Sequence, residues 1–256
     1  MPTAILIDGA YFIKRFRSIE PHNAYDAQRA AEFAFRSAVA HLSEPYGPKP
    51  GNGGQRQGAR RHELYRIFFY DCPPLEKKLH NPITKKSIDF GKSEEAVFRY
   101  ELHNLLRQRR KVALRLGHLA GDTPWTIKPQ TIEDLLKGRR KFEELTDADV
   151  VPNVRQKGVD MRIGIDISSL AIKKQVDQIV LFAGDADFVP AAKLARREGV
   201  DFVLDPMWQA IPAGLNEHID GLRSTCARPK RKTDSACELP AAEESPPAAV
   251  NQVSTP

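Results

Sequence analysis

The sequence has few cysteines and no long apolar segment. Its three cysteines, Cys72, Cys226 and Cys237, form no Cys-x-x-Cys pair. Three is a small and odd number of cysteines, which fits a protein of the reducing cytosol better than a disulfide-bonded secreted protein. No apolar run approaches the roughly 20 residues of a membrane span. The first apolar run ends at Asp8 and follows no basic segment, unlike a signal peptide. We therefore expect a soluble, cytoplasmic protein that does not contact a membrane.

Several common catalytic motifs are also missing. No phosphate-binding P-loop, Gly-x-Gly-x-x-Gly turn or nucleophile elbow follows a predicted strand. The seven histidines are scattered and form no His-x-x-x-His pair. These absences disfavour a nucleoside triphosphatase, a serine hydrolase and a zinc enzyme.

The composition is that of a folded domain with appendages. The 256 residues carry 39 basic and 33 acidic side chains, a net charge of +6 that mildly favours nucleic acid as a partner. We expect one domain over residues 1–225. It would contain a flexible Gly/Pro/Arg-rich insertion at about 45–61 and a helical and extended insertion at about 121–150. Residues 228–256 are rich in proline, lack hydrophobic periodicity and predict a disordered tail.

Strands and helices alternate along the predicted domain. Apolar runs predict strands at 3–8, 62–74, 112–120, 177–185 and 200–206. Helical spacing predicts helices at 10–19, 26–44, 93–111, 188–199 and 214–222, with an extended piece at 125–129 and a polar helical piece at 132–145. This order predicts an α/β fold of three layers, Rossmann-like, with a mainly parallel central sheet.

Residues 159–176 fit two patterns. Their apolar side chains alternate from Met161 to Ile167, as in a strand, but they also form a helical stripe. The segment is long for a strand, and Lys173 and Lys174 suit the C-terminal end of a helix. We therefore predict a helix that places Asp160 at its start.

Four acids follow the predicted buried strands or begin helices. Asp8 and Asp185 end strands, Asp187 lies in the turn after Asp185, and Asp160 begins a helix. The ends of parallel strands and the starts of the following helices share one edge of the sheet, where ligands bind. Taken singly, each acid also fits a helix N-cap. Together they predict carboxylates whose repulsion a hard cation such as Mg²⁺ or Mn²⁺ would relieve.

Asp166 is a different case. It lies six residues beyond Asp160, roughly 240° around the helix, so the two carboxylates do not share a metal. Asp166 either contacts the metal-binding residues without binding the metal itself or is a polar residue of helix packing. The packing interpretation is favoured.

Three segments resemble the NYN domain, a branch of the PIN-like (5′-nuclease-like) metal-dependent nucleases. They are "AILIDGAYF", "KGVDMRIGIDISSLA" and "DQIVLFAGDADFVPAAKLARREGVDFVL", which frame residues 3–220. The resemblance implies a PIN-like fold, a Mg²⁺ or Mn²⁺ site and RNA cleavage by metal-activated water. By position it implies that the metal-binding and catalytic acids are Asp8, Asp160, Asp185 and Asp187.

The sequence departs from the family at two places. Many members have Asn shortly after the Asp-Gly pair, where this chain has Ala10 and Tyr11. Ser or Thr often precedes the Gly-Asp-x-Asp run, where this chain has Ala183.

Candidate substrate contacts are less specific. Lys157, three residues before Asp160, could meet a phosphate or be a solvated surface residue. Tyr11 could stack on a base, although packing under the first helix is favoured. Basic runs at 56–61, 107–111 and 138–141 would steer an anionic backbone if they border the acids, but such runs are usually solvated faces.

Three functions remain open at this point. A metal-dependent endoribonuclease is favoured, and a non-catalytic RNA-binding regulatory module on the same fold is the main alternative. A phosphohydrolase with an Asp nucleophile ranks last, because "ILIDG" lacks the second Asp that such a site needs. The sequence leaves the oligomeric state open, including a homo-oligomer.

Overall fold

The computed structural model describes residues 2–43 and 62–229. The expected insertion at 45–61 therefore lies outside the described residues, as does the tail at 228–256 apart from residues 228 and 229. Within the described part, no helix is long and apolar enough to cross a membrane.

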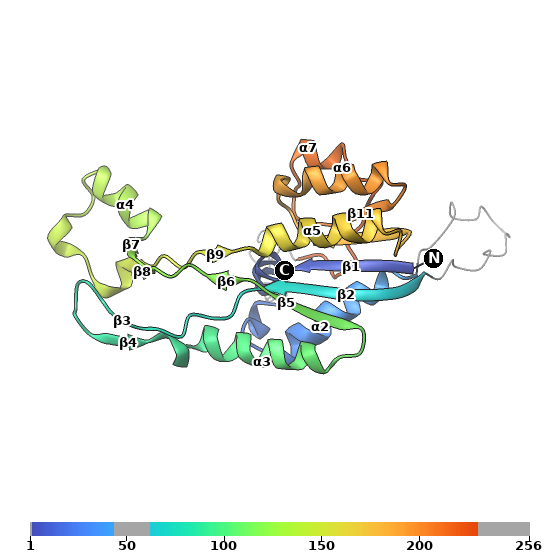
Figure 1. The fold of residues 1–256 in the computed structure, drawn as a ribbon. Coiled ribbons are helices and arrows are strands. Elements are labelled where there is room, and N and C mark those ends of the chain that lie inside the picture. Colours follow the sequence, from blue (N-terminus) through green and yellow to red (C-terminus); the bar gives the residue numbers. More distant parts are fainter. Residues whose placement is uncertain (1, 44–61, 230–256) are drawn as a thin grey trace, which may run out of the picture.

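A six-stranded parallel sheet forms the centre of the molecule (Figure 1). Its order is β12-β11-β10-β1-β2-β5, and every neighbouring pair runs parallel. The strands are β1 (Pro2–Asp8), β2 (Glu63–Asp71), β5 (Val112–Leu116), β10 (Gln178–Phe182), β11 (Asp201–Asp205) and β12 (Gly221–Leu222). The predicted α/β fold with a mainly parallel sheet is confirmed.

Helices cover both faces of this sheet (Figure 1). One face packs against α1 (Gly9–Ile19), α2 (Ala27–Ala40) and α3 (Glu94–Gln108) through a phenylalanine-rich core. The other face packs against α5 (Val159–Ile172), α6 (Val189–Arg197) and α7 (Ala213–Asn216) through aliphatic side chains and alanines. Residues 159–176 thus form a helix, as their length and charged end predicted.

A long arm projects from the edge at which β2 and β5 end (Figure 1). We define the arm as residues 77–92 and 118–157. It contains three antiparallel pairs, β3 (Lys78–His80) with β4 (Ser87–Asp89), β6 (His118–Leu119) with β9 (Gln156–Lys157), and β7 (Trp125–Ile127) with β8 (Val150–Pro152). It also carries α4 (Pro129–Leu136). Residues 121–150, the expected insertion, lie within this arm, whereas the β3–β4 hairpin was not predicted.

Three expected elements differ from the structure. The strand expected over 112–120 is wrong beyond Leu116, because residues 118–119 form β6 and pair with β9 instead of with the central sheet. The helical piece expected over 132–145 ends at Leu136, since Gly138 adopts a positive φ of 67°. Residues 221–222 of the expected last helix form β12 instead.

Gly9 is required where α1 begins against β2. A Cβ at this residue would lie 2.5 Å from the Tyr70 carbonyl oxygen and 2.7 Å from the Phe69 ring. The carbonyl is bonded within the sheet and cannot move aside. We expect Gly9→Ala to lower the free energy of unfolding by about 1–3 kcal/mol, measured by urea denaturation.

Gly164 in α5 provides the matched control. A Cβ there meets nothing within 4 Å, so Gly164→Ala should raise stability by about 0.5–1 kcal/mol through helix propensity. Equal effects of the two substitutions would contradict the close approach at Gly9.

Candidate active site

Asp8 ends β1 at the carboxyl edge of the sheet and also begins α1. Its carboxylate accepts a hydrogen bond from the Tyr11 backbone N–H at 3.2 Å, so it caps the helix. Burial raises the pKa of this carboxyl to about 6, and the negative charges of Asp160 and Asp71 contribute to the increase. The residue is therefore both an N-cap and one member of an acidic group.

Asp160 lies in the first turn of α5, where the arm leads into the helix. Gly158 precedes it with a φ of 78°, a left-handed conformation that glycine adopts without strain. Burial raises the pKa of Asp160, and the charges of Asp185 and Asp187 raise it further. Asp160 thus interacts electrostatically with both the Asp8 and the Asp185 segments.

Asp185 and Asp187 lie in the turn that follows β10. Asp185 accepts a hydrogen bond from the Asp187 backbone N–H at 3.2 Å and caps the short helix at Ala186–Phe188. Both side chains are exposed. The preceding Gly184 packs directly on Tyr11, since a Cβ there would lie 2.7 Å from the Tyr11 ring.

None of these four acids has a cationic partner among the residues that the structure describes. Within residues 2–43 and 62–229, no ion pair involves Asp8, Asp160, Asp185 or Asp187. The same described residues contain no group of three acidic, histidine or cysteine side chains set close enough to hold a metal ion. The acids therefore share one edge and repel each other without forming a closed cage.

Two other acids at this edge are fully paired. Asp71 ends β2, is completely buried, and contacts Arg99 Nη1 at 2.5 Å and His103 Nε2 at 2.8 Å. The sequence analysis did not select it, although it follows an apolar strand as Asp8 does. The charge of Asp71 contributes to the raised pKa of Asp8. Its pairing with Arg99 and His103 reduces the repulsion between Asp71 and Asp8.

Asp205 ends β11 in the same way. It lies 2.9 Å from His41 Nε2, and it accepts hydrogen bonds from the Met207 backbone N–H at 2.8 Å and from Thr225. These contacts satisfy its carboxylate and tie the chain after β11 to α2. We assign Asp205 a role in the fold.

The remaining predicted residues lie as follows. Asp166 accepts a hydrogen bond from the Tyr70 hydroxyl at 2.8 Å and pairs with Arg115 at 3.3 Å, so it packs α5 onto the sheet, the interpretation favoured from the sequence. The Tyr11 hydroxyl donates to the Pro206 carbonyl at 2.7 Å. Lys157 is exposed on β9, at the base of the arm.

The described basic runs are partly engaged within the protein. Arg140 forms an ion pair with Asp149 at 2.7 Å, and Arg139 pairs with Asp134 at 3.2 Å. The Arg109 guanidinium lies over the Phe35 ring. The run at 56–61 lies outside the described residues. These arginines stabilise local structure as well as adding positive charge.

Comparison with known proteins gives one family match. Residues 100–209 match the family model of the NYN domain. The match confirms the NYN resemblance over these residues and includes Asp160, Asp185 and Asp187 but not Asp8. The NYN domain belongs to the PIN-like nucleases, which generally depend on a divalent metal and act on RNA.

The wider comparisons add little. No curated protein matches the chain with significance. Among solved structures, a protein of unknown function from Vibrio parahaemolyticus aligns with 14% identity and a TM-score of 0.39 over 86% of this chain and 90% of its own.

Ionisation of Asp8 is expected to oppose folding. Its pKa of about 6 in the folded chain exceeds its ordinary value of 3.8, so the destabilisation is absent below about pH 4 and complete above about pH 6. In chelator at about pH 8, Asp8→Asn should raise the free energy of unfolding by about 2–3 kcal/mol, because Asn keeps the N-cap. At about pH 3.5 the variant and the parent should coincide, as measured by urea denaturation.

Asp177→Asn is the control, since Asp177 is an exposed acid that precedes β10 at the opposite edge of the sheet. A stability gain from Asp8→Asn that is the same at both pH values would show that the carboxyl charge is not its cause.

Proposed function

We propose that this protein is a metal-dependent ribonuclease that hydrolyses RNA phosphodiester bonds at the acidic edge of the sheet. The observation that carries the proposal is a set of four acids from three distant segments that lack cationic partners among the described residues, beside two acids that have them. The NYN match over residues 100–209 supports the nuclease class. The mild positive net charge of +6 is compatible with an anionic polymer as substrate.

The donor set fits a hard divalent cation. Asp8, Asp160, Asp185 and Asp187 offer carboxylate oxygens, which Mg²⁺ and Mn²⁺ prefer. Mutual repulsion contributes to the raised pKa of Asp8 and of Asp160, and a cation would relieve it. Mg²⁺ usually keeps several waters, so a complete protein cage is not required. Bound there, the ion would supply an activated water and charge neutralisation at the phosphate.

The surrounding residues hold these acids in place. The N-cap bond to the Tyr11 backbone and the close approach of Gly9 to β2 fix Asp8. The Tyr11 ring supports Gly184 and hence the turn that carries Asp185. Since both the ring and the hydroxyl of Tyr11 are engaged, we assign it a positioning role. Lys157 is exposed three residues before Asp160 and could meet a phosphate there.

A non-catalytic RNA-binding module on the same fold is the second candidate. It is favoured by the absence, among described residues, of a three-ligand group set to hold a metal ion. In this case the protein would bind RNA equally well with or without a divalent ion and would cleave nothing.

Cleavage assays distinguish the two functions. We expect purified protein to cleave labelled RNA, single-stranded or structured, with Mg²⁺ or Mn²⁺ and to lose cleavage in EDTA. The Asp185→Asn/Asp187→Asn double variant should lose at least about 100-fold in rate, because amides cannot replace two charged ligands of the ion. Asp177→Asn should cleave like the parent.

Binding of the ion can be measured without activity. Mn²⁺ should raise the melting temperature of the parent and of Asp177→Asn, but not that of the double variant. RNA binding with no cleavage under any metal, together with no thermal shift, would reject the nuclease and leave the binding module.

A further inference from the structure

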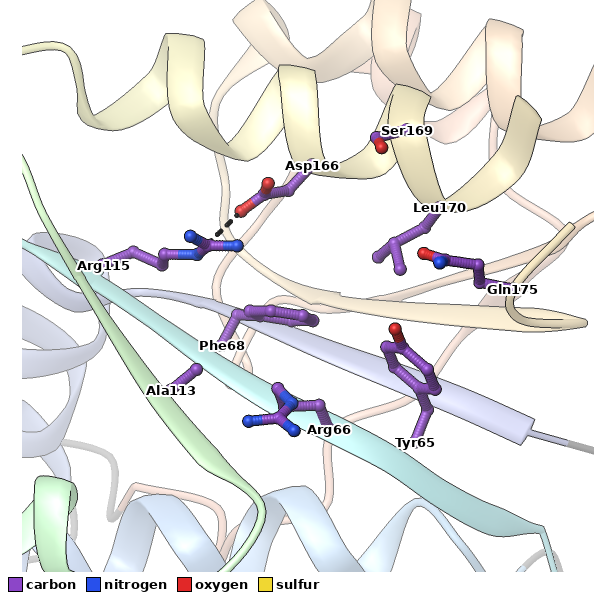
Figure 2. Close-up of a pocket in the computed structure, with 9 residues that line it drawn as sticks. All are labelled: Tyr65, Arg66, Phe68, Ala113, Arg115, Asp166, Ser169, Leu170 and Gln175. Carbon is purple, nitrogen blue, oxygen red and sulfur yellow. Dashed lines mark ion pairs between the residues drawn. The ribbon is translucent and has the colours of Figure 1, made fainter. Parts of the chain in front are cut away.

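A groove lies on the α5 face of the sheet, and none of the four acids lines it. It has a volume of about 350 Å³. Figure 2 shows Tyr65 and Phe68 on β2 pointing toward α5, with Arg115 on β5 and Gln175 after α5 completing the walls. Neither the NYN match nor the acidic edge assigns a role to this groove.

The groove exists because α5 does not cover the whole sheet. β5 is the last strand of the sheet, and α3 packs on its other face. On the α5 face β5 presents only the small Ala113 and the exposed Arg115 beside the groove. Because no helix of the described residues covers this face of β5 beyond α5, a space remains between α5 and the edge of the sheet.

An irregularity in β2 directs an aromatic ring into this space. The register between β1 and β2 shifts between Thr3 and Ala4, so Tyr65 has no partner residue on β1. A strand bulge re-aims side chains, and Tyr65 packs on the same side of the sheet as Phe68 although the two are three residues apart. Regular alternation would have placed them on opposite faces.

The polar groups of the groove divide into a paired set and a free set. Asp166 is satisfied by Tyr70 and by Arg115, whose guanidinium lies 5.5 Å from the centroid of the Phe68 ring. In the described part of the chain, the side chains of Tyr65, Arg66, Ser169 and Gln175 form no hydrogen bond or ion pair. Two arginines and one aspartate leave the groove with a net charge of +1.

We propose that this groove binds one nucleotide of the RNA strand, and this inference rests on the proposed function. Tyr65 and the guanidinium plane of Arg115 offer flat surfaces for a base. Arg66 offers an unpaired guanidinium to a phosphodiester, whose single negative charge matches the net charge of the groove. Ser169 and Gln175 supply free hydrogen-bonding groups for the base or sugar.

The position of the groove relative to the acids suits a continuous strand. α5 carries Asp160 in its first turn and Ser169 beside the groove, nine residues further on. That separation is about 13.5 Å along the helix axis, so a strand of a few nucleotides could reach both. The groove would then hold RNA beside the acids rather than at the bond that is cut.

The test measures binding of a short labelled single-stranded RNA by fluorescence anisotropy in EDTA, over about 50–200 mM salt. Tyr65→Leu keeps an apolar side chain but removes the ring, and it should weaken binding about 5- to 150-fold without changing the salt dependence. Arg66→Ala should weaken binding and reduce the slope of log K against log[salt] by about 0.7. Arg36→Ala, an exposed arginine on α2 in the opposite helix layer, should change neither quantity.

A second binding experiment, with a mononucleotide in place of RNA, tests whether the groove binds a free nucleotide instead of an RNA strand. If AMP or UMP binds in a manner that requires Tyr65 while RNA affinity is unchanged in the variants, the groove holds a free nucleotide and the RNA-strand proposal is overturned. If both groove variants bind RNA like Arg36→Ala, it is overturned as well. Metal-dependent cleavage by the parent would in either case leave the proposed nuclease standing.

Discussion

β1 pairs in parallel with β10 on one side and with β2 on the other, and this pairing decides which side chains meet at the carboxyl edge. Ile7 lies opposite Phe182 and Asp8 opposite Tyr70. The chain after each strand therefore emerges at the same level. Residues separated by more than 170 positions, such as Asp8 and Asp185, come to one edge because the strands before them share a register. Every other feature of the candidate site builds on this arrangement.

The carboxylates at this edge of the sheet are of two kinds, paired and mutually repelling. Asp71 and Asp205 are fully buried, and each contacts a histidine. Asp8 and Asp160 instead repel neighbouring acids, and their pKa values are raised. A fold selected only for stability would not keep unpaired acids together, since the repulsion opposes folding at neutral pH. Destabilising groups that persist beside well-paired ones are typical of functional sites.

Local patterns in the sequence were sufficient for the main elements. Apolar runs located the strands of the sheet except for β12, and residue spacing with Lys173 and Lys174 identified α5 as a helix. The four candidate acids followed from strand ends and helix starts. Asp71 carried the same signal as Asp8 but was not selected. Its pairing with Arg99 and His103, which lie in a helix about 30 residues away, could not be predicted from the sequence.

Features that depend on distant pairing were not predictable. The β3–β4 hairpin is polar and short, so it has no strong alternation. β6 pairs with β9, which lies about 40 residues later in the chain, and not with the central sheet. The irregularity at Tyr65 is likewise a feature of the pairing with β1, which lies about 60 residues earlier in the chain.

The connection between the arm and α5 has a mechanical consequence. β9 ends at Lys157, Gly158 follows in a left-handed conformation, and Asp160 lies two residues further on. The arm and this acid are therefore joined directly, with no loop between β9 and α5. Gly158 is the one residue between the end of β9 and the start of α5, so any displacement of the arm at β9 would reach the helix turn that carries Asp160 across a single residue.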